Sequence, residues 1–393
     1  MQSDFFKYQA QTSPNPLALE IGKAKGSYIY DIYGNKYLDF IAGISANTLG
    51  HRPPKVIKAI KKQVDSYLHV MVYGEFIQKP QVDLAKYLSS KLPKSLQSVY
   101  ITNSGTEATE GALKLAKRVT GRYEIISAKN AYHGNTQGAM SVCGREEQNS
   151  AFRPLIPGIK FIEFNRMSDL KLINRNTAAV ILETIQGGAG FIEPDENYLN
   201  KVKVRCKEVG ALLILDEIQC GIGRTGKLFG FENYDVIPDI IVTGKGLGGG
   251  MPIGAFISSY KNMSLLKKDP KLGHITTFGG HPVIASAALA TLKEVLSGNL
   301  MEKTLEKEKL IRKLLVHKSI VEIRGKGLML ALVVKNSEIA NQLILGSIKH
   351  GLLLFWLLFE PNAIRITPPL NISKKDIKKG CTIIINILNQ INS

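Results

Sequence analysis

The chain has 393 residues, 44% of them hydrophobic and 21% charged, with 36 glycines and 16 prolines. This composition excludes an intrinsically disordered protein and supplies enough apolar side chains for one large domain or two unequal ones. Lys and Arg number 51 against 33 Asp and Glu, and the resulting formal charge of +18 makes a nucleic acid a candidate partner.

The positive charge is spread along the whole chain rather than collected in one patch. Acidic and apolar residues separate the lysines, and no arginine-rich run or aromatic stacking motif accompanies them. A solvated surface is therefore favoured over a nucleic-acid site, and we expect no nucleic-acid partner. The basic stretches are 55–62, 261–271, 303–318 and 374–379.

The cysteines and the apolar runs indicate the compartment. The wide spacing of the cysteines argues against a disulfide framework or a zinc site, so we expect a reducing compartment and no metal. Residues 1–10 lack the apolar core of a signal peptide, and the longest apolar run, 352–359, is far shorter than the roughly 20 residues that span a bilayer. These features predict a cytoplasmic protein. The four cysteines are Cys143, Cys206, Cys220 and Cys381.

The first elements in chain order are a hairpin and two helices. Residues 26–40 alternate apolar and polar side chains around a Tyr-Gly-Asn turn at 33–35, which predicts two antiparallel strands. The apolar spacing of 53–68 and 80–92 predicts two amphipathic helices after the hairpin.

Short apolar runs then alternate with helical stretches, such as the helices predicted at 107–119 and 196–208. Several runs are continuously apolar, as expected of strands covered on both faces. The pattern predicts an α/β fold with a mainly parallel sheet between two layers of helices. The predicted strands are 98–102, 123–127, 160–163, 178–183, 212–216, 240–244 and 254–258.

Beyond about residue 290 the pattern changes to a long helix rich in Lys, Glu and Leu, strands near 321–334 and 363–368, and a final helix. These elements predict a smaller α+β domain. We expect three regions: an N-terminal segment, 1–45, that packs with the small domain; a large domain, 46–290; and the small domain, 291–393.

A candidate phosphate site follows the first strand of the large domain. Ser104, Gly105 and Thr106 place hydroxyls and backbone N–H groups at the start of a helix, whose dipole attracts an anion. The alternative is a helix cap without a ligand. The stretch lacks the motifs of P-loop and dinucleotide sites, so a bound phosphate would belong to another cofactor.

Two further features lie at strand ends of the same domain. Asp216 and Glu217 end a strongly apolar strand, where a carboxylate can pair with a cationic ring nitrogen; a cap or a surface acid is the alternative. Lys245 lies in a glycine-rich turn, where small neighbours and burial suit Schiff-base chemistry. The candidate phosphate site, the carboxylate and the lysine together predict the three groups that bind pyridoxal 5′-phosphate.

At these residues the chain closely resembles the class-III (subgroup II) aminotransferases of the fold-type-I pyridoxal-phosphate superfamily, which include acetylornithine, ornithine and 4-aminobutyrate aminotransferases. The similarity extends from 26–40 to 365–370, and the stretch 215–255 is its most specific part. The resemblance implies a seven-stranded, mainly parallel sheet domain with helices on both faces and a smaller α+β domain.

The resemblance also implies roles for the cofactor-binding residues. Lys245 would form the Schiff base with the cofactor and carry the proton of the reaction. Asp216 would hold the pyridinium nitrogen, Gln219 would lie near the ring hydroxyl, and Tyr132 would stack on the ring. The phosphate-binding residues would be Ser104, Gly105 and Thr106.

Thr277 and Arg365 match two further family positions. Thr277 matches the threonine that reaches across a dimer interface to the neighbouring cofactor phosphate, which implies a homodimer. Arg365 matches the arginine that binds a substrate carboxylate. A salt bridge at a domain edge is the alternative for Arg365.

The predicted substrate-binding residues are Arg365, Ile44, Asn135 and Glu183. Ile44 lies in 43–51, a stretch similar to that of acetylornithine enzymes, at a position where ornithine enzymes carry a tyrosine. Two positions depart from the family pattern: Gly188, shortly after Glu183, replaces a common glutamate, and Asn135 replaces a common arginine.

The resemblance therefore implies a transaminase of amino-acid biosynthesis, such as arginine biosynthesis. It would move the ω-amino group of an N-acylated diamino acid such as N-acetylornithine to 2-oxoglutarate, giving a semialdehyde and glutamate. Ornithine, 4-aminobutyrate, lysine and diaminopelargonate are alternative donors. The alternative outside this class is a basic nucleic-acid-binding protein that has kept only the scaffold.

Overall fold

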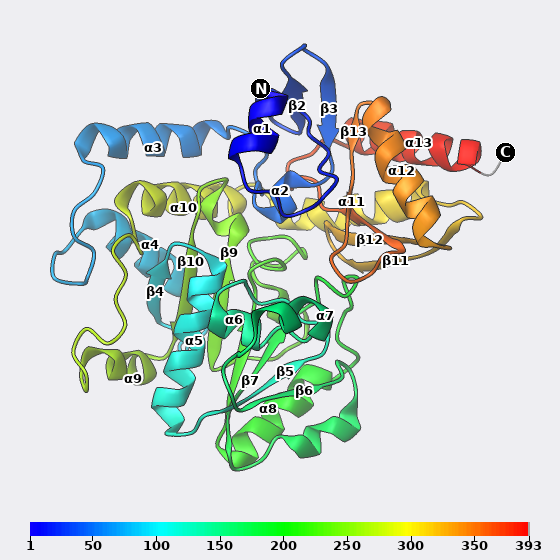
Figure 1. Ribbon diagram of the computed structural model, residues 1–393. Coiled ribbons are helices and arrows are strands. Elements are labelled where there is room, and N and C mark those ends of the chain that lie inside the picture. Colours follow the sequence, from blue (N-terminus) through cyan, green and yellow to red (C-terminus); the bar gives the residue numbers. More distant parts are fainter. Residues whose placement is uncertain (392–393) are drawn as a thin grey trace.

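The computed structural model describes residues 1–391. At its centre (Figure 1) lies a sheet of seven strands: β4 (Ser98–Thr102), β5 (Glu124–Ala128), β6 (Ile159–Ile162), β7 (Thr177–Glu183), β8 (Leu212–Asp216), β9 (Ile240–Gly244) and β10 (Gly254–Ser258). Their order is β4-β10-β9-β8-β7-β5-β6. Neighbours from β9 to β6 are parallel, and β10 is antiparallel to β4 and β9. The predicted fold class, with its mainly parallel seven-stranded sheet, is confirmed.

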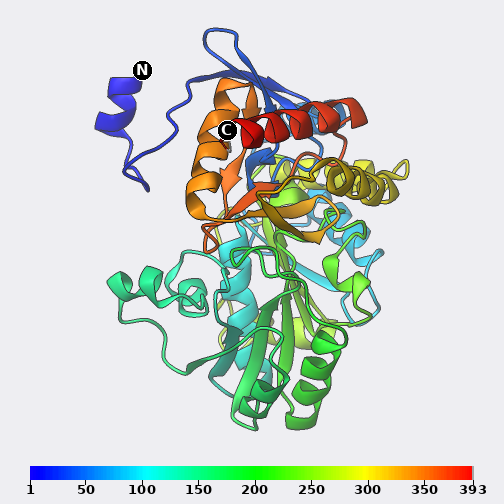
Figure 2. The same ribbon diagram turned by 90° about the vertical axis from the view of Figure 1, so that its right-hand side faces the viewer.

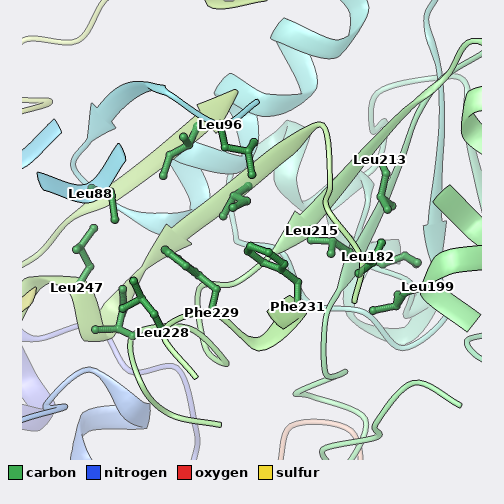
Figure 3. Packing of buried hydrophobic residues seen from close by; sticks show 14 of the residues in the cluster. Leu88, Leu96, Leu182, Leu199, Leu213, Leu215, Leu228, Phe229, Phe231 and Leu247 are labelled. Atoms are coloured by element: carbon green, nitrogen blue, oxygen red, sulfur yellow. The ribbon is translucent and has the colours of Figure 1, made fainter. Parts of the chain in front are cut away.

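Apolar side chains are buried against both faces of this sheet. In β8, Leu213 and Leu215 belong to one apolar cluster (Figure 3) and Ile214 to another, because successive side chains of a strand point to opposite faces. This burial accounts for the continuous apolar runs in the sequence. Gly111 lets α5 (Gly105–Thr120) lie close to the sheet, since a Cβ there would clash with the Phe256 ring.

The helices predicted before residue 290 are present, with small shifts at their ends. α5 begins after Ser104, whose hydroxyl accepts a hydrogen bond from the Glu107 N–H (3.3 Å), and it ends at Gly121, which has a φ of 68°. Pro54 starts α3 (Pro54–Ser66), where the missing N–H removes no helical hydrogen bond. The other helices here are α2 (Ala42–Ser45), α4 (Lys79–Ser89), α6 (Gln137–Ser141), α7 (Glu146–Asn149), α8 (Tyr198–Val209), α9 (Tyr260–Met263) and α10 (Pro282–Val295).

The predicted N-terminal hairpin is confirmed as β2 (Tyr28–Asp31) and β3 (Lys36–Asp39), and the unpredicted β1 (Ile21–Lys25) extends it. β13 (Leu352–Leu353) pairs in parallel with β3, so N-terminal and C-terminal regions share one sheet. Figure 2 shows α1 (Gln2–Tyr8) apart from this sheet, and none of its residues is buried. The domain boundaries expected from the sequence stay a prediction.

A second small sheet carries part of the candidate site. Its antiparallel strands are, in order, β11 (Ile320–Lys326), β12 (Met329–Val334), β15 (Ala363–Ile366) and β14 (Phe355–Trp356). An apolar cluster joins this sheet to the C-terminal helices. These helices are α11 (Leu300–Leu314), α12 (Ser337–Lys349) and α13 (Lys374–Ile391).

The sequence pattern predicts α11, α13, β11, β12 and β15, but not α12 or the short strands β13 and β14. The apolar run 352–359 is divided between these two strands and the loop after them. Within residues 1–391, no single helix is long and apolar enough to cross a membrane. α10 and α11 reach the required length only as a pair, with a bend of 68° between them.

Candidate active site

A cavity of about 580 Å³ lies where the carboxyl ends of β7, β8 and β9 meet the sheet that carries β14 and β15. Ligands of open α/β sheets bind at this edge. Ser104 and Thr277 do not line the cavity. The other predicted site residues do: Ile44, Gly105, Thr106, Tyr132, Asn135, Glu183, Asp216, Gln219, Lys245 and Arg365.

The N-terminus of α5 contributes Gly105 and Thr106 to the cavity lining. The backbone N–H groups of Gly105 and Thr106 have no partner within the helix and lie at the positive end of its dipole. Oγ1 of Thr106 accepts hydrogen bonds from the N–H groups of Asn135 and Thr136 (3.2 and 3.3 Å), which joins their loop to the helix. Ser104 turns its hydroxyl to the first helical turn, so its contact with a phosphate stays a prediction.

Asp216 lines the cavity at the end of β8, and both of its carboxylate oxygens have partners. Its Oδ1 accepts a hydrogen bond from the Ile218 N–H (2.9 Å), and its Oδ2 lies 2.7 Å from Nδ1 of the buried His133. The sequence pattern does not indicate this histidine, because the two partners are 83 residues apart. The contact with His133 fixes the orientation of the carboxylate.

Glu217, the second acid at this strand end, has a structural role. It is fully buried, and its carboxylate accepts hydrogen bonds from Oγ1 of Thr184 (2.6 Å) and from the N–H groups of Gly230 and Phe231 (2.6 and 2.7 Å). Burial raises the pKa of Glu217 to about 7 despite these bonds. Glu217 therefore braces the loop after β8 and takes no part in the cavity.

We expect Glu217→Ala to lower the free energy of unfolding by about 3 kcal/mol, because four buried donors, one of them the Cys220 thiol, lose their acceptor. The loss should be larger at pH 5 than at pH 8. The folded pKa of Glu217 lies above the unfolded value, so the stability that this group contributes is complete below the unfolded pKa and declines as the pH rises through about 7. Urea unfolding at both pH values measures the loss in the free energy of unfolding, and Glu208→Ala, at an exposed position, is the control. Equal losses at the two pH values would contradict the titration.

Lys245 lies at the end of β9 between two glycines and has a φ of 39°, in the left-handed region. It is partly exposed, and its amine has no hydrogen bond or ion pair within residues 1–391. Burial and the charge of Arg365 lower the pKa of Lys245, and the carboxylates of Asp216 and Glu183 oppose this shift. The neutral amine, which can act as a nucleophile or base, is therefore easier to form than in an ordinary lysine.

Arg365 reaches the cavity from β15. Only 5% of it is exposed, and its Nε and Nη1 have no hydrogen-bond partner in the described chain. Its guanidinium lies 5.3 Å from the centre of the Phe191 ring, and burial lowers the pKa of Arg365 to about 10. No salt bridge of residues 1–391 includes Arg365, so the geometry fits a carboxylate ligand rather than a domain-edge ion pair.

Gly188, one of the two departures from the family pattern, has a packing reason. A Cβ on Gly188 would lie 2.8 Å from the Phe359 ring, so this ring excludes a larger side chain.

Glu183 accepts hydrogen bonds from the N–H groups of Gly187 (2.9 Å) and Tyr132 (3.2 Å), and burial raises the pKa of Glu183 to about 7. Glu183 therefore positions the backbone around the cavity.

A strained turn brings Ile44 to the cavity. Ala42, Ile44 and Ser45 have φ values of 47°, 58° and 70°, which are unfavourable for residues other than glycine and most of all for a β-branched one. Asp39 holds the turn by accepting hydrogen bonds from the N–H groups of Ile41 and Ala42 (2.8 and 2.9 Å). The sequence pattern gives Ile44 as a candidate but does not indicate this strain.

Thr277 lies outside the cavity on an exposed segment between α9 and α10. Its neighbours Ile275 and Phe278 are 45% and 53% exposed, which is unusual for large apolar side chains. Its predicted contact with a neighbouring subunit's cofactor stays a prediction.

The cavity fits the cofactor that the strand-end residues predict. Lys245, Asp216 and the N-terminus of α5 match an aldehyde, a ring nitrogen and a phosphate. Nε2 of Gln219 is buried and has no hydrogen-bond partner within residues 1–391, as expected of a donor that binds a ligand oxygen.

Comparison with known proteins assigns the chain to a family. The family model described as Aminotransferase class-III matches residues 8–388, so the chain belongs to the class-III aminotransferases. It is a transaminase, which acts on an amino donor and a 2-oxo acid. This assignment argues against the alternative of a scaffold that only binds nucleic acid. The family implies pyridoxal phosphate as the cofactor.

Similar proteins differ in the amino donor that their names state. The chain is 38% identical to the acetylornithine aminotransferase of Caldanaerobacter subterraneus subsp. tengcongensis, over 96% of each chain. It is also 38% identical to the putrescine aminotransferase of Pectobacterium atrosepticum, over 93% of this chain and 81% of that one. The crystal structure of ornithine aminotransferase from Toxoplasma gondii has a TM-score of 0.92 at 29% identity and covers 100% of this chain and 96% of that one.

Proposed function

We propose that the chain transfers the ω-amino group of an N-acylated diamino acid such as N-acetylornithine to 2-oxoglutarate, with pyridoxal 5′-phosphate as cofactor. The products are a semialdehyde and glutamate, as in arginine biosynthesis, and the proposed location is the cytoplasm. The observation that carries the proposal is that Lys245, Asp216, Arg365 and the N-terminus of α5 line one cavity. Acetylornithine aminotransferases that are 36–39% identical over nearly the whole chain support the donor.

Bound pyridoxal phosphate supplies an electron sink for the carbon that carries the transferred nitrogen. Gly105 and Thr106 would hold its phosphate through backbone N–H groups, and Asp216 would keep its ring nitrogen protonated. Nζ of Lys245 would hold its aldehyde group and would serve as the base and acid of the reaction. His133 positions Asp216 for its role.

The remaining predicted residues surround the cofactor and the donor. Tyr132 would pack against the cofactor ring, and Nε2 of Gln219 would donate a hydrogen bond to the ring hydroxyl. Ile44 and Asn135 line the space for the donor. Glu183 shapes the substrate space indirectly, because its carboxylate positions the backbone of Tyr132 and Gly187.

Arg365→Ala is expected to lower kcat/KM for 2-oxoglutarate by about 10²- to 10³-fold, because a carboxylate loses a bidentate, charge-assisted partner. Arg365→Lys should recover only part of this loss, since an ammonium lacks the planar fork. Steady-state kinetics with varied 2-oxoglutarate measures both variants, and the exposed Arg166→Ala is the control. An unchanged kcat/KM in Arg365→Ala would show that Arg365 does not bind the carboxylate of 2-oxoglutarate.

A donor panel tests the proposed function. The purified holoenzyme is given 2-oxoglutarate with N-acetylornithine, ornithine, 4-aminobutyrate, lysine or diaminopelargonate, and glutamate formation is followed. The proposal expects the highest kcat/KM with N-acetylornithine. A higher value with any unacylated donor would replace the proposed donor with that one.

The proposed catalytic unit is a homodimer in which Thr277 of each subunit binds the cofactor phosphate of the other. Exposed apolar residues around a groove next to Thr277 support it: Tyr73, Phe76, Ile77, Leu272 and Ile275. Sedimentation should give twice the chain mass of 43.2 kDa. A fully active monomer would contradict the dimer.

A further inference from the structure

The cavity has an apolar wall to which the proposed transfer chemistry assigns no role. Residues 355–358, Phe-Trp-Leu-Leu, line the cavity and belong to the longest apolar run of the sequence. Phe355 pairs directly with Arg365 between β14 and β15, so the two side chains lie on the same face of that sheet. A ligand carboxylate on Arg365 therefore has this apolar wall beside it.

The wall is held in place by contacts at both ends. Nε1 of Trp356 donates a hydrogen bond to Oδ1 of Asn341 on α12 (2.6 Å), and the rings of Phe355 and Trp356 meet edge-on with centroids 5.2 Å apart. After the wall, the Phe359 N–H donates a hydrogen bond to the Gly188 carbonyl (2.9 Å). The apolar surface is thus formed before a ligand binds, so little ordering cost opposes binding.

The lining that residues 1–391 form offers no free carboxylate to a second ammonium group on the donor. Every oxygen of Asp216 and Glu183 already has a hydrogen-bond partner in the protein. The guanidinium of Arg365, also in the lining, is a cationic group that repels an ammonium. A donor with one amine to transfer and no other positive charge fits these surroundings.

We infer that the wall, residues 355–358, binds a hydrocarbon group of the amino donor and that the enzyme selects acylated donors against free diamines. This inference rests on the proposed function and defines its donor class more narrowly. The donor carries a carboxylate for Arg365 and an acyl chain on its α-nitrogen, which removes the second positive charge and packs on the wall. Ornithine, lysine and putrescine are the disfavoured class.

The first test is a chain-length series with the holoenzyme. From N-acetyl- to N-butyryl- to N-hexanoylornithine, kcat/KM should rise about two- to fourfold for each added methylene that the wall buries. Ornithine should be roughly 100-fold poorer than N-acetylornithine, because its second ammonium has no partner. Leu358→Gln should remove most of the gain with chain length, and Leu345→Gln, a leucine of similar exposure on α12, should keep it (49% and 50% exposed).

The second test does not depend on turnover. Trp356 is the one tryptophan of the chain, so intrinsic fluorescence reports on the wall. N-hexanoylnorvaline has the carboxylate and the acyl chain but no ω-amine, and it should change the Trp356 emission saturably, with weaker affinity in Leu358→Gln. An unchanged emission, no dependence on chain length, or ornithine turnover equal to that of N-acetylornithine would overturn the inference. A fluorescence response without turnover of any donor would keep the wall and contradict only the proposed function.

Discussion

Lys245→Ala is expected to lower kcat by about 10⁴-fold or more, because the variant loses both the amine that attaches the cofactor and the group that moves the proton. Among residues 1–391, Lys245 is the only lysine in the cavity lining, so no neighbouring amine replaces it. Burial and the charge of Arg365 lower the pKa of Lys245, which makes its neutral form easier to reach. Steady-state kcat with N-acetylornithine and 2-oxoglutarate measures the loss.

The control for this variant is Lys227→Ala, an exposed lysine that lies outside the cavity. It should keep full activity. Borohydride reduction followed by peptide mapping should find the cofactor on the Lys245 peptide of the wild type and on no peptide of Lys245→Ala. Turnover by Lys245→Ala within tenfold of the wild type would exclude the proposed role.

Asp216→Asn is expected to lower kcat by about 10³-fold while the protein still binds pyridoxal phosphate. A carboxylate about 4 Å from a cationic ring nitrogen stabilises it by about 4 kcal/mol at an effective dielectric constant of about 20, and the amide removes this term. The α5 N-terminus keeps its N–H groups for the phosphate, so kcat should change more than cofactor affinity. Kinetics at saturating cofactor and equilibrium dialysis separate the two effects.

Asp235→Asn is the matched control for this substitution. Asp235 is exposed and has a φ of 48°, a backbone conformation that asparagine accepts well. It should leave kcat unchanged. If Asp216→Asn also retains wild-type kcat, the carboxylate does not hold the ring nitrogen.

The sheet and most of the cavity are predictable because they depend on local pattern. Strands buried on both faces require continuous apolar runs, and the residue that follows such a run lies at the edge where ligands bind. Asp216 ends β8 and Lys245 directly follows β9, so the sequence predicts both residues at the carboxyl ends of strands; the pairing of β8 with β9 then places them in one cavity. The helix start at Gly105 follows from its capping residue in the same way.

Other parts depend on contacts between distant segments, which the sequence pattern does not show. His133 meets Asp216 across 83 residues, and the Phe359 ring occupies the space that a larger residue at 188 would need. The apolar run 352–359 is evident in the sequence, but only the pairing of β14 with the strand of Arg365 places part of this run beside the cavity. Local propensity carries no information about such pairings.

We propose that the chain moves the ω-nitrogen of an acylated diamino acid to 2-oxoglutarate through Lys245. An isotope experiment tests this transfer by following ¹⁵N from N-acetylornithine labelled only at the ω-position, with purified holoenzyme and unlabelled 2-oxoglutarate. The wild type should give ¹⁵N-glutamate and the acylated semialdehyde in equal amounts, and Lys245→Ala should give neither product. Unlabelled glutamate, or labelled glutamate from the Lys245→Ala variant at the wild-type rate, would contradict it.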